Sequence, residues 1–238
     1  MAITIAAYIC TAVFLWRVLW HILLLCLTTE KNRLPRPADQ PTGPMTLLRA
    51  AEDVLFLTRL YRVNKLLWAG EWVFHGAFFL VVVRHLRYFF YPVPEWILSL
   101  QTAGLYAGAV LPLSLLYILA VKFGIEKKSY FSSSNFMLLL LLILVSATGI
   151  LMTTLLRTDL VEIKHFTLSA LALSPVPAPE STTFIIHFVL SLVFLVFLPT
   201  HIFAAPYTLF QARKRDDTLH GMMHKGIRFH SGEGGEEE

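Results

Sequence analysis

Charged residues are scarce in this chain of 238 residues. Only 15% are Asp, Glu, Lys or Arg, whereas 56% are hydrophobic and the mean hydropathy is +0.62. A soluble domain carries about 25% charged residues and has too little interior to hide this much apolar surface. The hydrophobic residues are also gathered into long runs. The composition therefore excludes an ordinary soluble fold and favours a chain embedded in a lipid bilayer.

Cysteine is equally scarce. Cys10 and Cys26 are the two cysteines of the sequence, both lie in the first apolar run, and no Cys-x-x-Cys motif occurs. An iron–sulfur cluster or a structural zinc site needs several such ligands at close spacing. Neither group is therefore expected within this chain.

Five apolar runs reach the length of about 20 residues that one crossing of the bilayer needs. They cover residues 3–27, 67–91, 97–121, 134–156 and 181–210. Each must be helical, because lipid offers the backbone no hydrogen-bond partner, and the stretch Met137–Val145 lacks the alternation of a barrel strand. The first run has no basic start and no cleavage site, so we expect a helix rather than a signal peptide.

The sequence thus predicts an all-α fold, a polytopic membrane bundle of five transmembrane helices. Residues 1–215 form this bundle, and residues 216–238 form a polar cytoplasmic tail that we expect to be disordered.

Lysine and arginine predict the orientation. The segments 28–66, 122–128 and 211–238 hold seven, three and five of the twenty basic residues, and with five spans all three face one side. The other side receives Arg84, Arg87, Arg157 and Lys164. The positive-inside rule puts the N-terminus outside and the C-terminus in the cytoplasm, with the chain in the inner (cytoplasmic) membrane. Topology also explains the net charge of +4, so no nucleic-acid partner is expected.

Two local patterns concern packing and partners. The connection 28–66 starts with four prolines and continues with an amphipathic stretch, Met45–Leu60. Such a stretch is typical of a helix lying on the membrane surface, and equally of a surface that binds a partner protein. In the third run, Gly104 and Gly108 form the G-x-x-x-G spacing that favours close helix packing.

Four histidines lie inside the apolar runs: His75 and His85 in the second, His187 and His201 in the fifth. Ionisable side chains are costly in a bilayer and need partners. A single such histidine is more often a hydrogen-bonding group between helices. Neutral imidazole is also a common axial ligand of heme iron, and two helices with two histidines each suit two b hemes with two histidine ligands apiece.

Depth in the membrane decides the pairing, because the two helices run in opposite directions. At ~1.5 Å per residue, His75 lies about 12 Å from the inner end of its helix, level with His201. His85 lies about 9 Å from the outer end, level with His187. The spacings of ten and fourteen residues differ, so helix tilt, heme tilt or a kink at Pro199 must absorb the difference. We expect an inner pair, His75 with His201, and an outer pair, His85 with His187.

The histidines stand in motifs that carry a family resemblance. Phe74-His75 is followed ten residues later by His85, and His187 precedes a Phe-Leu-Pro sequence at 197–199. The segment Arg84–Phe89 is followed by Pro92-Val93-Pro94. Over about residues 1–215 the chain resembles the gamma subunit of respiratory nitrate reductase and its relatives, the membrane cytochromes b of sulfite-reduction-associated (Dsr-type) and heterodisulfide-reductase-like complexes. The sulfite-reduction branch is the most similar.

The resemblance implies two b hemes that link the quinone pool to a cytoplasmic iron–sulfur subunit, and it allows for further membrane and periplasmic cytochrome subunits. One spacing departs from the nitrate reductase subunit, in which the second ligand of the fifth helix follows the first by eighteen residues. Here His201 follows His187 by fourteen. The fallback ligand is His21, at a similar depth in the first run, although beside Trp20 it also reads as an interfacial histidine.

Other polar residues leave alternatives open. Arg84 and Arg87 either pair with heme propionates at the outer surface or extend towards the interface, as flanking arginines commonly do. Glu71, one turn before His75, is a proton or hydrogen-bond partner or an interfacial residue. His165 is expected to be solvated. His220 and His224 have the spacing of a metal pair but no evident third ligand, so metal is not expected there.

The quinone, menaquinone or a similar compound, is expected on the outer side. A quinol loses protons as it reduces a heme, so its site needs an apolar approach and polar groups close to a heme edge. Arg87, Tyr88 and Glu95 supply such groups beside His85, and the nitrate reductase relatives also react with quinol near the outer heme. Glu71 is the competing proton acceptor on the inner side.

The sequence thus predicts an oxidoreductase subunit that transfers electrons between quinone and a cytoplasmic iron–sulfur subunit through two bis-histidine b hemes. Sulfur, sulfite or related anaerobic energy metabolism is its expected setting by resemblance. The alternative is a heme-free membrane anchor or a proton-relaying transporter subunit. A transporter usually shows internal repeats or broken helices, and neither is evident here.

Overall fold

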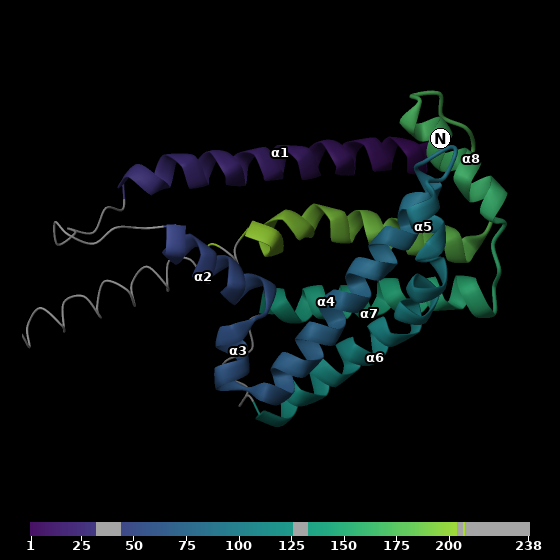
Figure 1. Ribbon diagram of the computed structural model, residues 1–238. Helices are drawn as coiled ribbons and strands as arrows, with labels where there is room; N and C mark the ends of the chain where they lie inside the picture. Colours follow the sequence, from purple (N-terminus) through teal and green to yellow (C-terminus); the bar gives the residue numbers. More distant parts are fainter. Residues whose placement is uncertain (32–43, 126–132, 204–206, 208–238) are drawn as a thin grey trace, which may run out of the picture. The chain divides into compact units, whose positions relative to one another are not determined.

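The computed structural model describes residues 1–31, 44–125, 133–203 and 207. All regular secondary structure in these residues is helical, as predicted (Figure 1). The described residues divide into two compact units. Unit 1 comprises Met1–Trp16 and Leu60–Leu198, and unit 2 comprises the described residues of Arg17–Arg59 and Pro199–Glu238. Each unit is described by itself.

In chain order, the described helices are α1 (Ala2–Lys31), α2 (Pro44–Leu55), α3 (Thr58–Val63), α4 (Lys65–His85), the 3-10 helix η1 (Leu86–Tyr88), α5 (Glu95–Ser99), α6 (Gln101–Ile125), α7 (Ser133–Thr154) and α8 (Leu160–Leu171). A C-terminal helix, Thr182–Phe203, follows.

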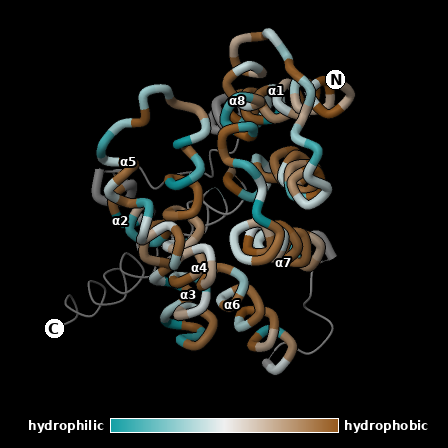
Figure 2. The backbone as a smooth tube through the Cα atoms, turned by 90° about the vertical axis from the view of Figure 1, so that its right-hand side faces the viewer, coloured by the Kyte–Doolittle hydropathy of each residue, from teal (hydrophilic) through white to brown (hydrophobic). Residues whose placement is uncertain are grey.

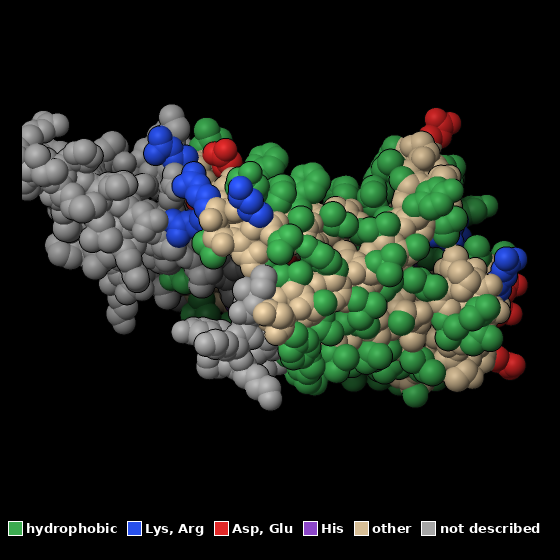
Figure 3. All heavy atoms as spheres, turned by 90° about the horizontal axis from the view of Figure 1, so that it is seen from below, with side chains coloured by type: hydrophobic (Ala, Val, Ile, Leu, Met, Phe, Trp, Pro, Cys, Tyr) green, Lys and Arg blue, Asp and Glu red, His purple; other side chains and the backbone are tan. Residues whose placement is uncertain are grey.

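Five helices of the described chain are long and apolar enough to cross a membrane, which confirms the predicted number of spans. The candidate spans are Ala2–Leu24, Lys65–Tyr88, Gln101–Gly124, Asn135–Thr154 and Thr182–Phe203. Figure 2 shows these helices coloured mainly as hydrophobic, and on the face drawn in Figure 3 hydrophobic side chains cover the middle. The chain is therefore a multi-pass membrane protein. Its orientation stays a prediction.

The second and third spans differ from the predicted boundaries. The second was expected to reach residue 91, but α4 ends at His85 and η1 at Tyr88. Pro92 and Pro94 follow, and proline removes a backbone donor and restricts the residue before it. The third span starts at Gln101 rather than at residue 97, because the short helix α5 precedes it.

Helix α6 packs against both α4 and α7 (Figure 1). The apolar core between these helices contains Leu67, Phe74, Ala77, Ala107, Leu111, Leu115, Ile118, Leu139 and Leu142. The start of α4 is fixed by Asn64, whose side chain accepts a hydrogen bond from the Leu67 amide at 3.0 Å. This three-helix core fixes the α4 helix that carries His75 and His85.

The predicted G-x-x-x-G contact involves one of its two glycines. A Cβ added at Gly104 would lie 2.8 Å from the Arg84 Cβ and 3.1 Å from the Leu80 carbonyl oxygen, whereas one at Gly108 would meet nothing within 4 Å. Gly104 therefore allows α4 to approach α6 closely, and Gly108 does not take part.

We expect Gly104→Ala to lower the stability of the bundle. Overpacking costs about 1–3 kcal/mol, more than the roughly 1 kcal/mol that alanine gains over glycine in a helix. Thermal unfolding in detergent checks this, with Gly108→Ala as the matched control, which should be neutral or slightly stabilising. Equal midpoints for the two variants would contradict the close contact.

The connection 157–180 contains a helix that the sequence analysis did not predict. Asp159 caps the start of helix α8, and its carboxylate accepts a hydrogen bond from the Val161 amide at 2.7 Å. Its Ile163 and Phe166 are buried in a second apolar cluster with Phe184 of the C-terminal helix. In α1, the Tyr8 hydroxyl donates to the Ala170 carbonyl at 2.8 Å. The capping aspartate and the apolar spacing of three residues were the missed signals.

The predicted amphipathic stretch Met45–Leu60 is not one continuous helix. Helices α2 and α3 are separated at Leu57, which has a positive φ of 51°. The Thr58 hydroxyl donates to the Asp53 carboxylate, and the Arg59 Nε lies 3.5 Å from the other Asp53 oxygen. The polar tail, His220 and His224 lie outside the described residues.

Candidate functional site

The structure brings together two of the four intramembrane histidines. His85 is the last residue of α4, and His187 lies in the first turns of the C-terminal helix. Their ring centroids are 6.3 Å apart, and the ring planes are inclined by only 19°. His85 is exposed and His187 partly buried in the bare chain. We call these two residues the outer histidine pair.

Backbone carbonyls determine which ring nitrogen of each histidine is free. The His85 Nδ1 lies 2.7 Å from the Val81 carbonyl oxygen, and the His187 Nδ1 lies 3.1 Å from the Val145 carbonyl oxygen. A carbonyl oxygen can only accept, so each Nδ1 is the protonated donor. Each Nε2 then keeps its lone pair, as a metal-bound imidazole requires.

The outer pair fits the axial ligand set of a heme. A histidine nitrogen binds a metal at about 2.0 Å, so two imidazoles on opposite sides of one ion have centroids roughly 6 Å apart. No group of three or more His, Cys, Asp or Glu suited to a metal ion occurs in the described part of the chain. Heme iron takes its other ligands from the porphyrin, so two histidines can complete its ligand set.

A polar cluster lies beside His85. Arg87 donates to the Gln101 side-chain oxygen at 2.9 Å and to the Tyr88 hydroxyl at 2.7 Å. Its guanidinium carbon is also 4.8 Å from the centre of the Tyr88 ring, and that ring lies 6.0 Å from the His85 ring. Arg87 is thus held by neighbours of this chain. Gln101 was missed in the sequence analysis, although a polar residue at the start of a span was a visible signal.

Arg84 differs from Arg87. Its aliphatic chain lies over Gly104, and the described residues give it no hydrogen bond or ion pair. Glu95, the third residue predicted for quinone, is exposed at the start of α5. Helix α5 contacts both η1 and α6, so Glu95 belongs to the same end of the bundle as Arg87.

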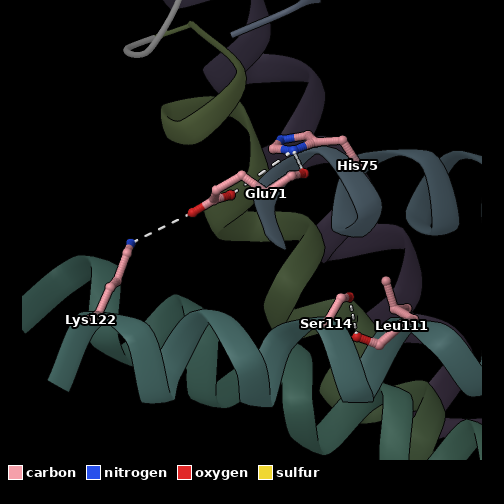
Figure 4. A network of polar contacts seen from close by, with 5 residues as sticks. All are labelled: Glu71, His75, Leu111, Ser114 and Lys122. Atoms are coloured by element: carbon pink, nitrogen blue, oxygen red, sulfur yellow. Dashed lines mark hydrogen bonds and ion pairs between the residues drawn. The ribbon is translucent and has the colours of Figure 1, made fainter. Parts of the chain in front are cut away.

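His75 lies in a separate ionisable cluster on α4 and α6 (Figure 4). Its Nδ1 is 2.6 Å from the Glu71 carbonyl oxygen and 4.0 Å from the Glu71 carboxylate. That carboxylate is 3.7 Å from the Lys122 Nζ. Glu71 and Lys122 compensate each other within two candidate spans, where an unpaired charge would be costly. Half of the His75 side chain is exposed.

Unit 2 holds the two candidates for the second inner ligand. The His21 Nδ1 lies 2.7 Å from the Arg17 carbonyl oxygen, and the His21 ring stacks on Phe203 at 5.5 Å. Arg17 donates to the Thr200 hydroxyl at 2.7 Å. His201 has an exposed side chain. Because His75 belongs to the other unit, its pairing with either histidine stays a prediction. His165, in α8, is exposed as predicted.

Fold and site together define a class: a polytopic α-helical membrane protein with a pair of neighbouring histidines contributed by two of its spans. The chain is 25% identical to the Hdr-like menaquinol oxidoreductase cytochrome b-like subunit of Archaeoglobus profundus, over 81% of this chain and 71% of that protein. No family model matches the chain, and no solved structure matches it. The similarity confirms the predicted resemblance to heterodisulfide-reductase-like membrane cytochromes b.

Proposed function

We propose that the chain is the cytochrome b subunit of a heterodisulfide-reductase-like, menaquinol-oxidising membrane complex. The observation that carries the proposal is the outer histidine pair, with ring centroids 6.3 Å apart, near-parallel rings and both Nδ1 atoms bonded to carbonyl oxygens. Similarity to a menaquinol oxidoreductase subunit from Archaeoglobus profundus supports it. A bound heme supplies one-electron transfer, and the chain supplies its axial nitrogens and its surroundings.

Two b hemes are proposed. His85 and His187 bind the outer one, and His75 binds the inner one with His201, or with His21 as the fallback. The Nδ1 of His75 bonds to the Glu71 carbonyl at 2.6 Å, which leaves its Nε2 for a metal as in the outer pair.

Arg84 is the better candidate for binding a heme propionate. Its guanidinium has no partner among the described residues, whereas Arg87 already donates to Gln101 and Tyr88. An arginine inside a span is costly unless an anion compensates its charge. Arg87 and Tyr88, which lie beside His85, would then help to bind the quinol.

The quinol is proposed to react on the outer side. Tyr88 and Arg87 form one bonded group next to the His85 ring, and Glu95 at the same bundle end provides a carboxylate that can accept a proton. Two protons must leave the quinol as electrons enter the chain, so an exposed carboxylate close to the heme edge suits this role.

The electrons are proposed to pass to a cytoplasmic iron–sulfur subunit. Support comes from the relative's membership of an Hdr-like complex and from the seven basic residues of segment 28–66 on the predicted cytoplasmic side. Location in the inner membrane and a role in sulfur, sulfite or related anaerobic metabolism, with further membrane or periplasmic cytochrome subunits, belong to the same proposal.

The direct test is a reduced-minus-oxidised spectrum of the purified protein together with a pyridine hemochrome assay. We expect b-type absorption and about two hemes per chain, one for each histidine pair. A protein that folds, stays in detergent as a monodisperse species and contains no heme would instead be a heme-free anchor or a proton-relaying transporter subunit.

The quinone site makes a separate prediction. We expect Glu95→Gln to slow menaquinol-linked heme reduction at least about tenfold, because general-base assistance is typically worth 10²–10⁴-fold. Glu71→Gln is the matched carboxylate control at the His75 cluster and should leave the rate largely unchanged. Stopped-flow reduction by a menaquinol analogue measures both, after spectra confirm that each variant keeps its hemes. Slowing by the Glu71 change alone would move the site to the inner side.

A further inference from the structure

A third helix contacts the outer histidine pair. His187 is flanked by Thr148 and Gly149 of α7, neither of which the sequence pattern singled out. The Thr148 Oγ1 lies 3.0 Å from the His187 Nδ1, and the Val145 carbonyl oxygen lies 3.1 Å from the same nitrogen. The His187 ring is therefore bonded through a neighbouring helix, whereas His85 bonds to its own helix at Val81.

The direction of these hydrogen bonds follows from the number of protons. The Thr148 hydroxyl has one proton, and it lies 2.9 Å from both the Leu144 and the Val145 carbonyl oxygens, which can only accept. The Thr148 hydroxyl thus donates its proton to a carbonyl oxygen of α7. Its oxygen can then accept a hydrogen bond from His187. Both neighbours of the His187 Nδ1 are then acceptors, and together they require a proton on Nδ1.

Gly149 supplies the space for this arrangement. A Cβ at Gly149 would lie 3.3 Å from the His187 Cε1 and 3.7 Å from its Nδ1. An alanine at this position would press on the imidazole and require it to move by a few tenths of an ångström. The α7 backbone and the imidazole are in close contact at this point.

We propose that Thr148 is a positioning residue that sets the tautomer and ring orientation of His187 as a heme ligand, with Gly149 allowing the contact. The inference rests on the proposed heme-binding function. A hydrogen-bond acceptor behind a metal-bound imidazole fixes the ring and raises the basicity of the ligating nitrogen. Thr148 therefore favours the oxidised iron and lowers the reduction potential of the outer heme.

The test uses the full-length protein purified with its hemes. Thr148→Val keeps the shape and removes the hydroxyl, and we expect an upward shift of the outer-heme potential and about tenfold weaker retention of that heme. Changed g-values of the oxidised outer heme in electron paramagnetic resonance should accompany the shift, because these values report the orientation of the axial imidazoles. Gly149→Ala should change the g-values as well.

Two variants separate positioning from a general effect on α7. Thr153→Val makes the same substitution on the same helix, where the hydroxyl donates to the Gly149 carbonyl at 2.8 Å and is not bonded to His187. It should leave potential and g-values unchanged, and Thr148→Ser should restore wild-type values. An unchanged potential and spectrum in Thr148→Val, or equal shifts in Thr153→Val, would overturn the inference while the proposed function stands. A wild-type protein without heme would overturn both.

Discussion

His85→Ala is expected to lower the heme content of the purified protein by about half, because a six-coordinate iron loses its site when one of its two axial nitrogens is removed. His187→Ala is expected to remove the same heme. The two ring centroids lie 6.3 Å apart, and each ring has its Nδ1 bonded to a carbonyl oxygen. Each histidine therefore supplies one ligand nitrogen, and the remaining histidine cannot supply both. The heme that remains should have an unchanged spectrum in both variants.

Pyridine hemochrome assays and potentiometric titration of each variant measure this result. His165→Ala is the matched control, because it removes an exposed histidine of α8 and should leave the heme content at the wild-type value. If His85→Ala and His187→Ala abolish different hemes, the two residues do not bind the same iron, and the outer pair is assigned incorrectly. Full heme content in either variant would exclude that residue as a ligand.

The five spans could be predicted because the bilayer imposes their length and their apolar composition on the sequence itself. The ends of the second and third spans depend on local backbone chemistry, and the prolines at positions 92 and 94 contained that information. Helix α8 is short and half-exposed, so its apolar residues did not form a run long enough to stand out.

For the candidate site, too, one part was predictable from the sequence and another was not. Depth alone predicted that His85 and His187 belong together, since opposite helix directions and a fixed rise per residue suffice for that argument. The partners that hold the rings and charges were not predictable. Thr148 approaches His187 across 39 positions of sequence, and Gln101 reaches Arg87 from another helix. Such contacts depend on the rotation of each helix about its axis, which packing of the apolar core between α4, α6 and α7 decides.

The inner site gives the second large effect. His75→Ala should remove about half of the heme and leave the outer heme intact, because the outer pair is held by α4, α7 and the C-terminal helix without any contact to His75 in the described residues. Potentiometric titration should then show one component in place of two. The loss of both hemes would mean that His75 supports the fold of the bundle rather than one cofactor.

The partner of His75 follows from comparing His201→Ala with His21→Ala. The His21 ring already stacks on Phe203 at 5.5 Å with an inclination of 18°, and this contact accounts for the side chain without a metal. His201 lies in the helix that also supplies His187, and its predicted depth matches that of His75. We therefore expect His201→Ala to lose the same heme as His75→Ala and His21→Ala to keep both, as measured by heme content and potential. Retention of both hemes in His201→Ala, together with loss of one in His21→Ala, would transfer the inner ligand from the C-terminal helix to α1.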